Sequence, residues 1–155
     1  MKNNKTTLTQ FNNSIQEGNT CIPVYKRILA DVLTPVGVWN SLNQGIQYGF
    51  IFESVEKNSK RSRYSYLGIN PNSVFISKGP KTEILKNNKI KTVNKSITEI
   101  IRENQNIYNQ KHTNDLPPFS GGMVGYLSYE FIRWYEDILT HKNNMIPESM
   151  FMLYE

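Results

Sequence analysis

The chain has 155 residues, of which 20% are charged and 38% hydrophobic, and its formal net charge is +5. Its single cysteine, Cys21, excludes an internal disulfide scaffold. No run approaches the ~20 apolar residues that a membrane-spanning helix needs. The first residues are polar and lack the apolar core of a secretory signal. We therefore expect a soluble protein of the cytoplasm, or of the plastid stroma if it is organelle-encoded.

The positive charge does not point to a nucleic acid. Most basic residues are scattered among asparagines, and the only tight cluster is Lys57, Lys60, Arg61 and Arg63. A nucleic-acid surface would concentrate Lys and Arg on one face with aromatic residues between them. We expect neither a nucleic-acid partner nor a membrane partner.

Two helices are predicted before residue 36. Apolar residues recur with helical spacing between residues 8 and 15, which predicts a first helix that ends at Gly18. A second apolar stripe predicts a helix from Pro23 to Leu33. Pro35 is expected to end this helix, because proline disfavours helical geometry in the residue before it.

From Val36 the apolar residues alternate with a period of two, which predicts strands. The expected strands are Val36–Trp39, Gly49–Val55, Arg63–Ile69, Ser73–Ser77, Thr82–Leu85 and Lys89–Val93. Short polar separators, such as residues 70–72 and 86–89, favour antiparallel hairpins over crossover connections.

A long helix is predicted next. Ser96 and Glu99 have the spacing of a capping box, and the apolar face runs on to Tyr108. After a polar loop we expect a glycine-rich strand over 120–127, an aromatic helix around 131–135 and a strand over 150–155. This order predicts an α+β fold of antiparallel sheets with outer helices. Because the sequence ends in an apolar strand, we expect the chain to be the front of a longer protein.

Several possible reactive sites receive little support. His112 and His141 lie in separate polar segments, with no cysteine or acid at ligand spacing, so no metal site is predicted. Cys21 has no catalytic motif around it and is interpreted as an inert thiol. The glycines of residues 121–125 lie in a predicted strand, where glycine more often marks a close backbone approach than a phosphate loop.

Glu53 and Ser54 are more informative. Alternation places them on opposite faces of a predicted strand whose other residues are apolar, and Arg63 opens the next strand. If buried, both polar groups need partners. Two interpretations stay open here: a buried polar pair that fixes the strand register, or a site that binds a small zwitterion.

The same residues resemble a known family, anthranilate synthase component I. Residues 52–56 (FESVE) and 63–68 (RYSYLG) are similar to its "LLESVE…RYSFLG" signature, and the resemblance runs from about Leu8 to Glu155. Three further segments match in order and spacing: residues 18–26 (GNTCIPVYK), 29–36 (LADVLTPV) and 118–130 (PFSGGMVGYLSYE).

The resemblance implies a lyase of tryptophan biosynthesis. Such enzymes add ammonia to chorismate with the help of Mg2+ and eliminate pyruvate to give anthranilate. A glutamine amidotransferase subunit, component II, supplies the ammonia, and L-tryptophan inhibits the enzyme. The implied fold is an α+β sandwich of antiparallel sheets. The alternatives are the aminodeoxychorismate synthase component I of folate synthesis and a stand-alone amino-acid-binding module.

The resemblance also assigns residues. Ser54 matches the serine that contacts the tryptophan inhibitor, Glu53 matches the acid beside it, and Arg63 falls near a basic residue of the same pocket. The family's catalytic residues and Mg2+ ligands lie beyond the position of Glu155. We therefore expect residues 1–155 to be an incomplete amino-terminal region, without catalytic or metal-binding residues and inactive alone.

Overall fold

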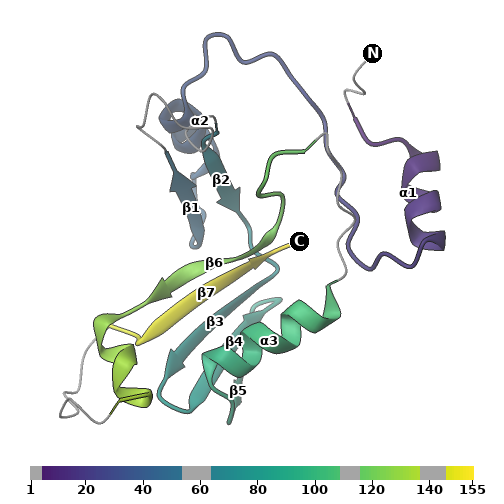
Figure 1. Ribbon diagram of the computed structural model, residues 1–155. Helices are drawn as coiled ribbons and strands as arrows, with labels where there is room; N and C mark the ends of the chain where they lie inside the picture. The colour runs from purple at the N-terminus through teal and green to yellow at the C-terminus, as the bar shows by residue number, and fades with distance from the viewer. Residues whose placement is uncertain (1–4, 54–63, 109–115, 137–145) are drawn as a thin grey trace. The chain divides into compact units, whose positions relative to one another are not determined.

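The computed structural model describes residues 5–53, 64–108, 116–136 and 146–155 (Figure 1). The chain divides into two compact units. Unit 1 comprises residues 1–70, 105–121 and 155, and unit 2 comprises residues 71–104 and 122–154. Among the described residues, no helix combines the length and the apolar character needed to cross a bilayer.

Unit 2 is built on a five-stranded antiparallel sheet with the strand order β5-β4-β3-β7-β6. Its strands are β3 (Ser73–Lys78), β4 (Lys81–Lys86), β5 (Lys89–Val93), β6 (Gly122–Leu127) and β7 (Ser149–Tyr154). Val74 of the central strand lies opposite Leu85 on one side and Met152 on the other. The antiparallel pairing confirms the predicted α+β class, and all five strands fall where the sequence predicts them.

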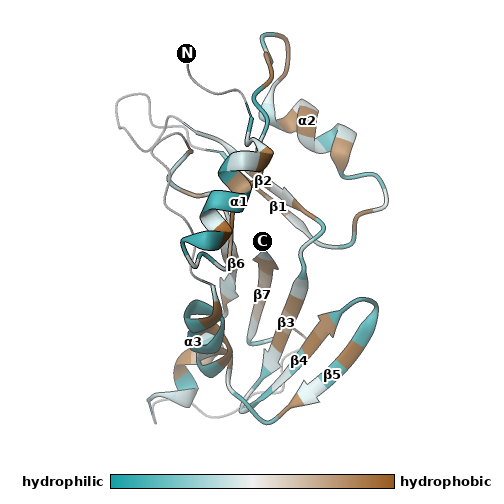
Figure 2. Ribbon diagram, turned by 90° about the vertical axis from the view of Figure 1, so that its right-hand side faces the viewer, coloured by the Kyte–Doolittle hydropathy of each residue, from teal (hydrophilic) through white to brown (hydrophobic). Residues whose placement is uncertain are grey.

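Helix α3 (Ile97–Ile107) lies along one face of this sheet (Figures 1 and 2). Its amino terminus has the predicted capping interaction, in which Ser96 N donates to Glu99 Oε2 at 2.8 Å. Ile97 and Ile100 are buried, and burying each such side chain contributes about 1.5–3 kcal/mol to folding. The predicted long helix is confirmed.

The Glu148 carboxylate links three segments of unit 2 by hydrogen bonds. Glu148 Oε2 accepts hydrogen bonds from the Gly79 backbone N–H at 2.7 Å and from Trp134 Nε1 at 2.6 Å. Trp134 ends the 3-10 helix η2 (Tyr129–Trp134), which stands where an aromatic helix was predicted. In η2, Phe131 N donates to the Ser128 carbonyl three residues earlier, at 3.1 Å. The tighter winding is therefore seen directly in the hydrogen bonding.

Unit 1 contains two helices and a hairpin: α1 (Leu8–Gln16), α2 (Pro35–Leu42), β1 (Gly49–Phe52) and β2 (Tyr66–Ile69). Helix α1 is the predicted first helix. Thr7 and Gln10 form a capping box at its start, with Thr7 N donating to Gln10 Oε1 at 2.9 Å. Gly18 follows with φ +81, a conformation that favours glycine.

The helix predicted from Pro23 to Leu33 is wrong, because this segment has no helix. Thr6 holds its first part extended: Thr6 Oγ1 donates to the Pro23 carbonyl at 3.0 Å and Thr6 N donates to the Tyr25 carbonyl at 3.1 Å. A β-bridge between Lys5 and Lys26 continues the pairing. These backbone groups are therefore not available to a helix.

The strand predicted for Val36–Trp39 is also wrong, since these residues belong to α2. Thr34 is extended and accepts a hydrogen bond from Gly37 N through its Oγ1 at 3.0 Å. Pro35 then occupies the first helical turn, where its missing N–H costs nothing. The Thr-Pro pair begins a helix here, so the prediction that Pro35 ends one is wrong.

Candidate functional site

The candidate site lies at the end of the β1–β2 hairpin. The two strands are antiparallel, with Phe50 opposite Gly68 and Phe52 opposite Tyr66. Glu53 directly follows β1. The hairpin prediction is thus confirmed over residues 49–52 and 66–69. Glu53 follows Phe52, which is the last paired residue of β1.

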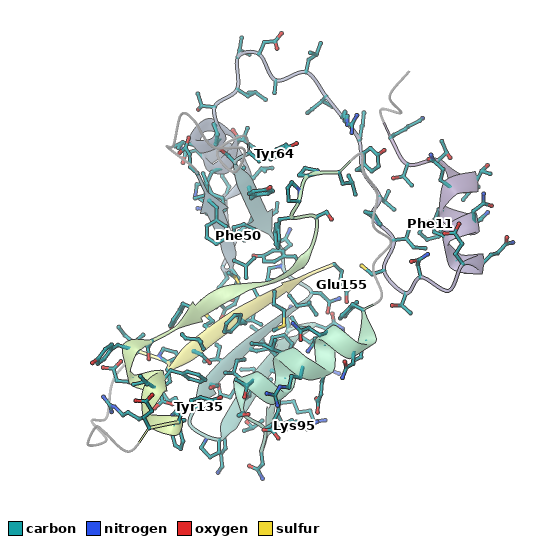
Figure 3. The ribbon with its side chains drawn as sticks, in the orientation of Figure 1. Phe11, Phe50, Tyr64, Lys95, Tyr135 and Glu155 are labelled. Atoms are coloured by element: carbon teal, nitrogen blue, oxygen red, sulfur yellow. The ribbon has the colours of Figure 1, made fainter. Side chains whose placement is uncertain are left out.

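Five aromatic rings surround the hairpin. Phe50 and Phe52 have ring centroids 4.8 Å apart, and Tyr64 and Tyr66 have centroids 6.0 Å apart. Phe119 makes edge contacts with two of these rings, at 6.2 Å from Phe50 and 5.6 Å from Tyr66. Figure 3 marks Phe50 and Tyr64 on the hairpin. Such edge-to-face pairs add about 0.5–1.5 kcal/mol each beyond the area that they bury.

Gly68 and Gly49 allow this close packing, because neither has a side chain. A Cβ at Gly68 would lie 2.2 Å from Phe50 Cε1, so the Phe50 ring lies directly against the Gly68 backbone. A Cβ at Gly49 would lie 2.8 Å from Trp39 Cη2 of α2. Helix α2 therefore supports the strand that leads to Glu53.

Of the three predicted site residues, the structure describes only Glu53. Glu53 is exposed, so its carboxylate remains solvated and needs no buried partner. The interpretation of Glu53 as half of a buried pair that fixes the register is therefore wrong. Ser54 and Arg63 lie outside the described residues, as do Lys57, Lys60 and Arg61 of the basic cluster.

Sequence reasoning missed the contributions of Phe119 and Trp39. Phe119 stands in the segment PFSGG, which carries part of the family resemblance. The structure shows that this segment contacts the hairpin that carries the FESVE motif, through the Phe119 ring. Two motifs far apart in the sequence therefore meet in one aromatic cluster.

Away from the hairpin, two titratable residues of unit 1, Tyr108 and Cys21, interact with Glu155. The Tyr108 hydroxyl donates to the Glu155 carboxylate, and this hydrogen bond, together with burial, raises the pKa of Tyr108 to about 12. Burial and then the charge of Glu155 raise the pKa of the Cys21 thiol. A raised pKa lowers the thiolate fraction at neutral pH, which supports the interpretation of Cys21 as an inert thiol.

Replacing Tyr108 by phenylalanine should make the stability less sensitive to alkaline pH. In the folded chain the pKa of Tyr108 is about 12, against a reference value of 10.0. The unfolded chain therefore loses this proton first, and the stability contributed by the neutral hydroxyl is complete below pH 10 and lost as the pH rises through 12. The check is the urea midpoint between pH 9 and pH 11, which should fall less in Tyr108→Phe than in the wild type. Tyr129→Phe, at a residue that is 79% exposed, is the control. A fall equal to that of the wild type would contradict the assignment.

Among the glycines of residues 121–125, Gly125 has a structural role in β6. A Cβ at Gly125 would lie 2.0 Å from the Met150 carbonyl oxygen and 2.6 Å from Phe151 Cα. Gly125 faces Phe151 in the β6–β7 register. The predicted close backbone approach is confirmed at this position.

The described residues offer no metal site. Among them, no group of three or more His, Cys, Asp or Glu side chains is placed to hold an ion. His112 and His141 lie outside the described residues. The Mg2+ that the resemblance implies therefore has no matching ligand set in the described part of the chain.

Several known proteins with similar sequences are anthranilate synthases. The anthranilate synthase component 1 of Synechocystis sp. is 35% identical over 129 residues, which are 83% of this chain and 25% of that protein. The enzyme from Acinetobacter calcoaceticus is 35% identical over 150 residues, 93% of this chain and 29% of that protein. The probable anthranilate synthase component 1 of Schizosaccharomyces pombe is 36% identical over 135 residues, 85% of this chain and 24% of that protein.

The chain is a relative of anthranilate synthase component 1. It spans about a quarter of the length of these curated relatives. No protein-family model matches it. The match to anthranilate synthases agrees with the resemblance inferred from the FESVE and PFSGG segments.

Proposed function

We propose that the chain is the amino-terminal portion of an anthranilate synthase component 1, and that the end of its β1–β2 hairpin is part of a tryptophan-binding regulatory site. The complete enzyme would convert chorismate and ammonia to anthranilate and pyruvate. The relatives that cover most of this chain carry the name of this enzyme, which favours it over aminodeoxychorismate synthase.

The observation that supports the regulatory role is that a carboxylate and an aromatic ring are both exposed at the end of β1. Glu53 is exposed at the end of β1, and the preceding Phe52 side chain is 52% exposed. A carboxylate can accept hydrogen bonds from an ammonium group, and aromatic rings stack with an indole. In this proposal Glu53 binds the amino group of tryptophan, the Ser54 hydroxyl binds a polar group of the ligand, and Arg63 binds its carboxylate.

The remaining features of the enzyme belong to the proposal for the whole protein. A glutamine amidotransferase subunit would supply ammonia, and Mg2+ would hold and polarise the substrate. The resemblance places the family's catalytic residues and Mg2+ ligands beyond the position of Glu155, so the proposal gives residues 1–155 no catalytic or metal-binding role. The contribution of this chain is then regulatory and structural.

Replacing Ser54 by alanine in the complete enzyme should weaken tryptophan inhibition. Loss of one ligand hydrogen bond costs about 0.5–1.5 kcal/mol, so the tryptophan concentration for half-inhibition should rise about two- to twelvefold. Activity without tryptophan should stay unchanged, because the site is regulatory. The measurement is anthranilate fluorescence against tryptophan concentration, with chorismate, ammonia and Mg2+ supplied.

Glu53→Gln tests the charge at the same site and should weaken inhibition further, since hydrogen bonds to charged groups are worth about 1.5–3 kcal/mol. Ser41→Ala is the matched control. Ser41 lies on α2, where its hydroxyl donates to the Gly37 carbonyl at 3.0 Å, so the control also removes a serine hydroxyl from unit 1. Unchanged inhibition curves for both Ser54→Ala and Glu53→Gln would overturn the assignment.

A further inference from the structure

Unit 1 exposes an apolar loop immediately before helix α2. All of residues 28–34 are exposed, and none of them lies in a helix or strand. Four of them are large aliphatic residues: Ile28 (72% exposed), Leu29 (88%), Val32 (94%) and Leu33 (52%). We call residues 28–34 the apolar loop. Figure 2 colours part of this loop, where it leads into α2, as hydrophobic.

This exposure is unusual for a connecting segment. Loops at a protein surface are normally polar, and a soluble monomer rarely exposes a contiguous apolar patch unless it binds something. The backbone of the apolar loop is shaped by a turn in which Leu33 N donates to the Ala30 carbonyl at 3.0 Å. The turn orders the chain without covering its side chains.

Unit 1 as a whole buries little apolar surface. Among the residues that the structure describes, Phe50 is its one buried apolar residue. The other buried apolar residues all belong to unit 2: Val74, Phe75, Ile97, Ile100, Val124, Met152 and Leu153. A two-stranded hairpin with so small a core is marginal by itself. Unit 1 therefore needs further apolar contacts, and the apolar loop offers four large exposed aliphatic side chains within six consecutive residues for them.

The length of the relatives indicates what makes these contacts. This chain spans 25% of the Synechocystis enzyme and 29% of the Acinetobacter enzyme. A polypeptide of that size has most of its residues outside the matching region. We propose that the apolar loop is an intramolecular docking segment, covered by the part of the synthase polypeptide that lies outside residues 1–155. This inference rests on the proposed function, because it takes the chain to be part of such an enzyme.

The apolar loop is also continuous with the candidate site. It ends at Thr34, which caps α2 through Gly37 N at 3.0 Å. Helix α2 in turn places Trp39 against Gly49 at the start of β1. Docking of the loop would therefore fix the helix on which the hairpin packs.

Amide hydrogen exchange of the complete enzyme tests the proposal. The amides of residues 28–34 should exchange at least about tenfold more slowly than those of Gln44 and Gly45, two exposed turn residues, because docking buries the first segment and leaves these two residues in solvent. Equal exchange in the two segments would overturn the proposal. So would protection that disappears on dilution of the protein, because a second copy of the chain would then be the occupant.

A pair of variants adds a second readout. Leu29→Asp combined with Val32→Asp should speed exchange in residues 28–34 about tenfold, because the carboxylates cannot enter an apolar interface. Gln44→Asp, at another exposed position of unit 1, should leave that exchange unchanged. Unchanged exchange in the double variant would overturn the proposal. Hydrogen exchange is read independently of anthranilate formation, so either the docking segment or the proposed function can fail while the other stands.

Discussion

Gly125→Val should lower the free energy of unfolding by more than about 3 kcal/mol, because the new side chain has no space in the sheet. Its Cβ would lie 2.0 Å from the Met150 carbonyl oxygen and 2.6 Å from Phe151 Cα. Both atoms belong to the backbone of β7, which pairs with β3 on its other side. Strand β7 therefore cannot move away without breaking the centre of the sheet. The measurement is the urea midpoint followed by circular dichroism.

Gly45→Ala is the control for this variant. Gly45 has φ +76, and no heavy atom lies within 4 Å of the position that a Cβ would take there, so alanine adds only backbone strain of about 1–2 kcal/mol. The difference between the two variants isolates the steric clash from the loss of glycine flexibility. A Gly125→Val chain as stable as Gly45→Ala would show that β6 and β7 lie far enough apart to accept a side chain.

The sequence predicts the sheet of unit 2 well, for a physical reason. Strands β3, β4 and β5 follow one another through short turns, and Asn87 and Asn88 between β4 and β5 have the positive φ values, 51 and 58, that asparagine tolerates in turns. Neighbouring strands are mostly close in the sequence, so local patterns nearly determine the pairing. The pairing of β7 with β3 is the exception, because it joins residues far apart in the chain.

The region before the hairpin is predicted poorly because distant contacts decide its structure. Apolar spacing favours a helix over residues 23–33, but Thr6 binds the backbone of Pro23 and Tyr25 and keeps them extended. Helix α2 is missed because the pattern of its first residues, Pro35 and Val36, indicates a helix stop and a strand start. The Thr34 side-chain cap provides the deciding local signal.

In the candidate site, too, local features are predicted from the sequence and contacts between distant segments are not. The pattern predicts the hairpin where the structure has it, but β1 ends at Phe52 and β2 begins at Tyr66, so Glu53, Tyr64 and Ser65 lie outside the strands that were predicted to include them. The contact between Phe119 and the Phe50 ring could not be predicted, because nothing in the local pattern links these segments. The pattern also leaves the burial of Glu53 open, since alternation assigns a face but not its environment.

Gly68→Ala should disturb the hairpin that carries Glu53 and thereby weaken tryptophan inhibition of the complete enzyme. The new Cβ would lie 2.2 Å from Phe50 Cε1. The Phe50 side chain is only 8% exposed and contacts the rings of Phe52 and Phe119, so it has little room to move. Overpacking of this kind costs about 1–3 kcal/mol. We expect a lower thermal midpoint and a severalfold rise in the tryptophan concentration for half-inhibition.

A double-mutant cycle separates this steric effect from a general loss of stability. Phe50→Leu removes the ring atoms that clash with the new methyl group, so Gly68→Ala should cost less in the Phe50→Leu background than in the wild type. Because the two residues face each other across the hairpin, their coupling should fall within about 0.5–3 kcal/mol. Additive effects would show that the Phe50 ring does not lie on Gly68. If the coupling is found but inhibition by tryptophan is unchanged in both single variants, the hairpin is correctly described and the tryptophan site lies elsewhere.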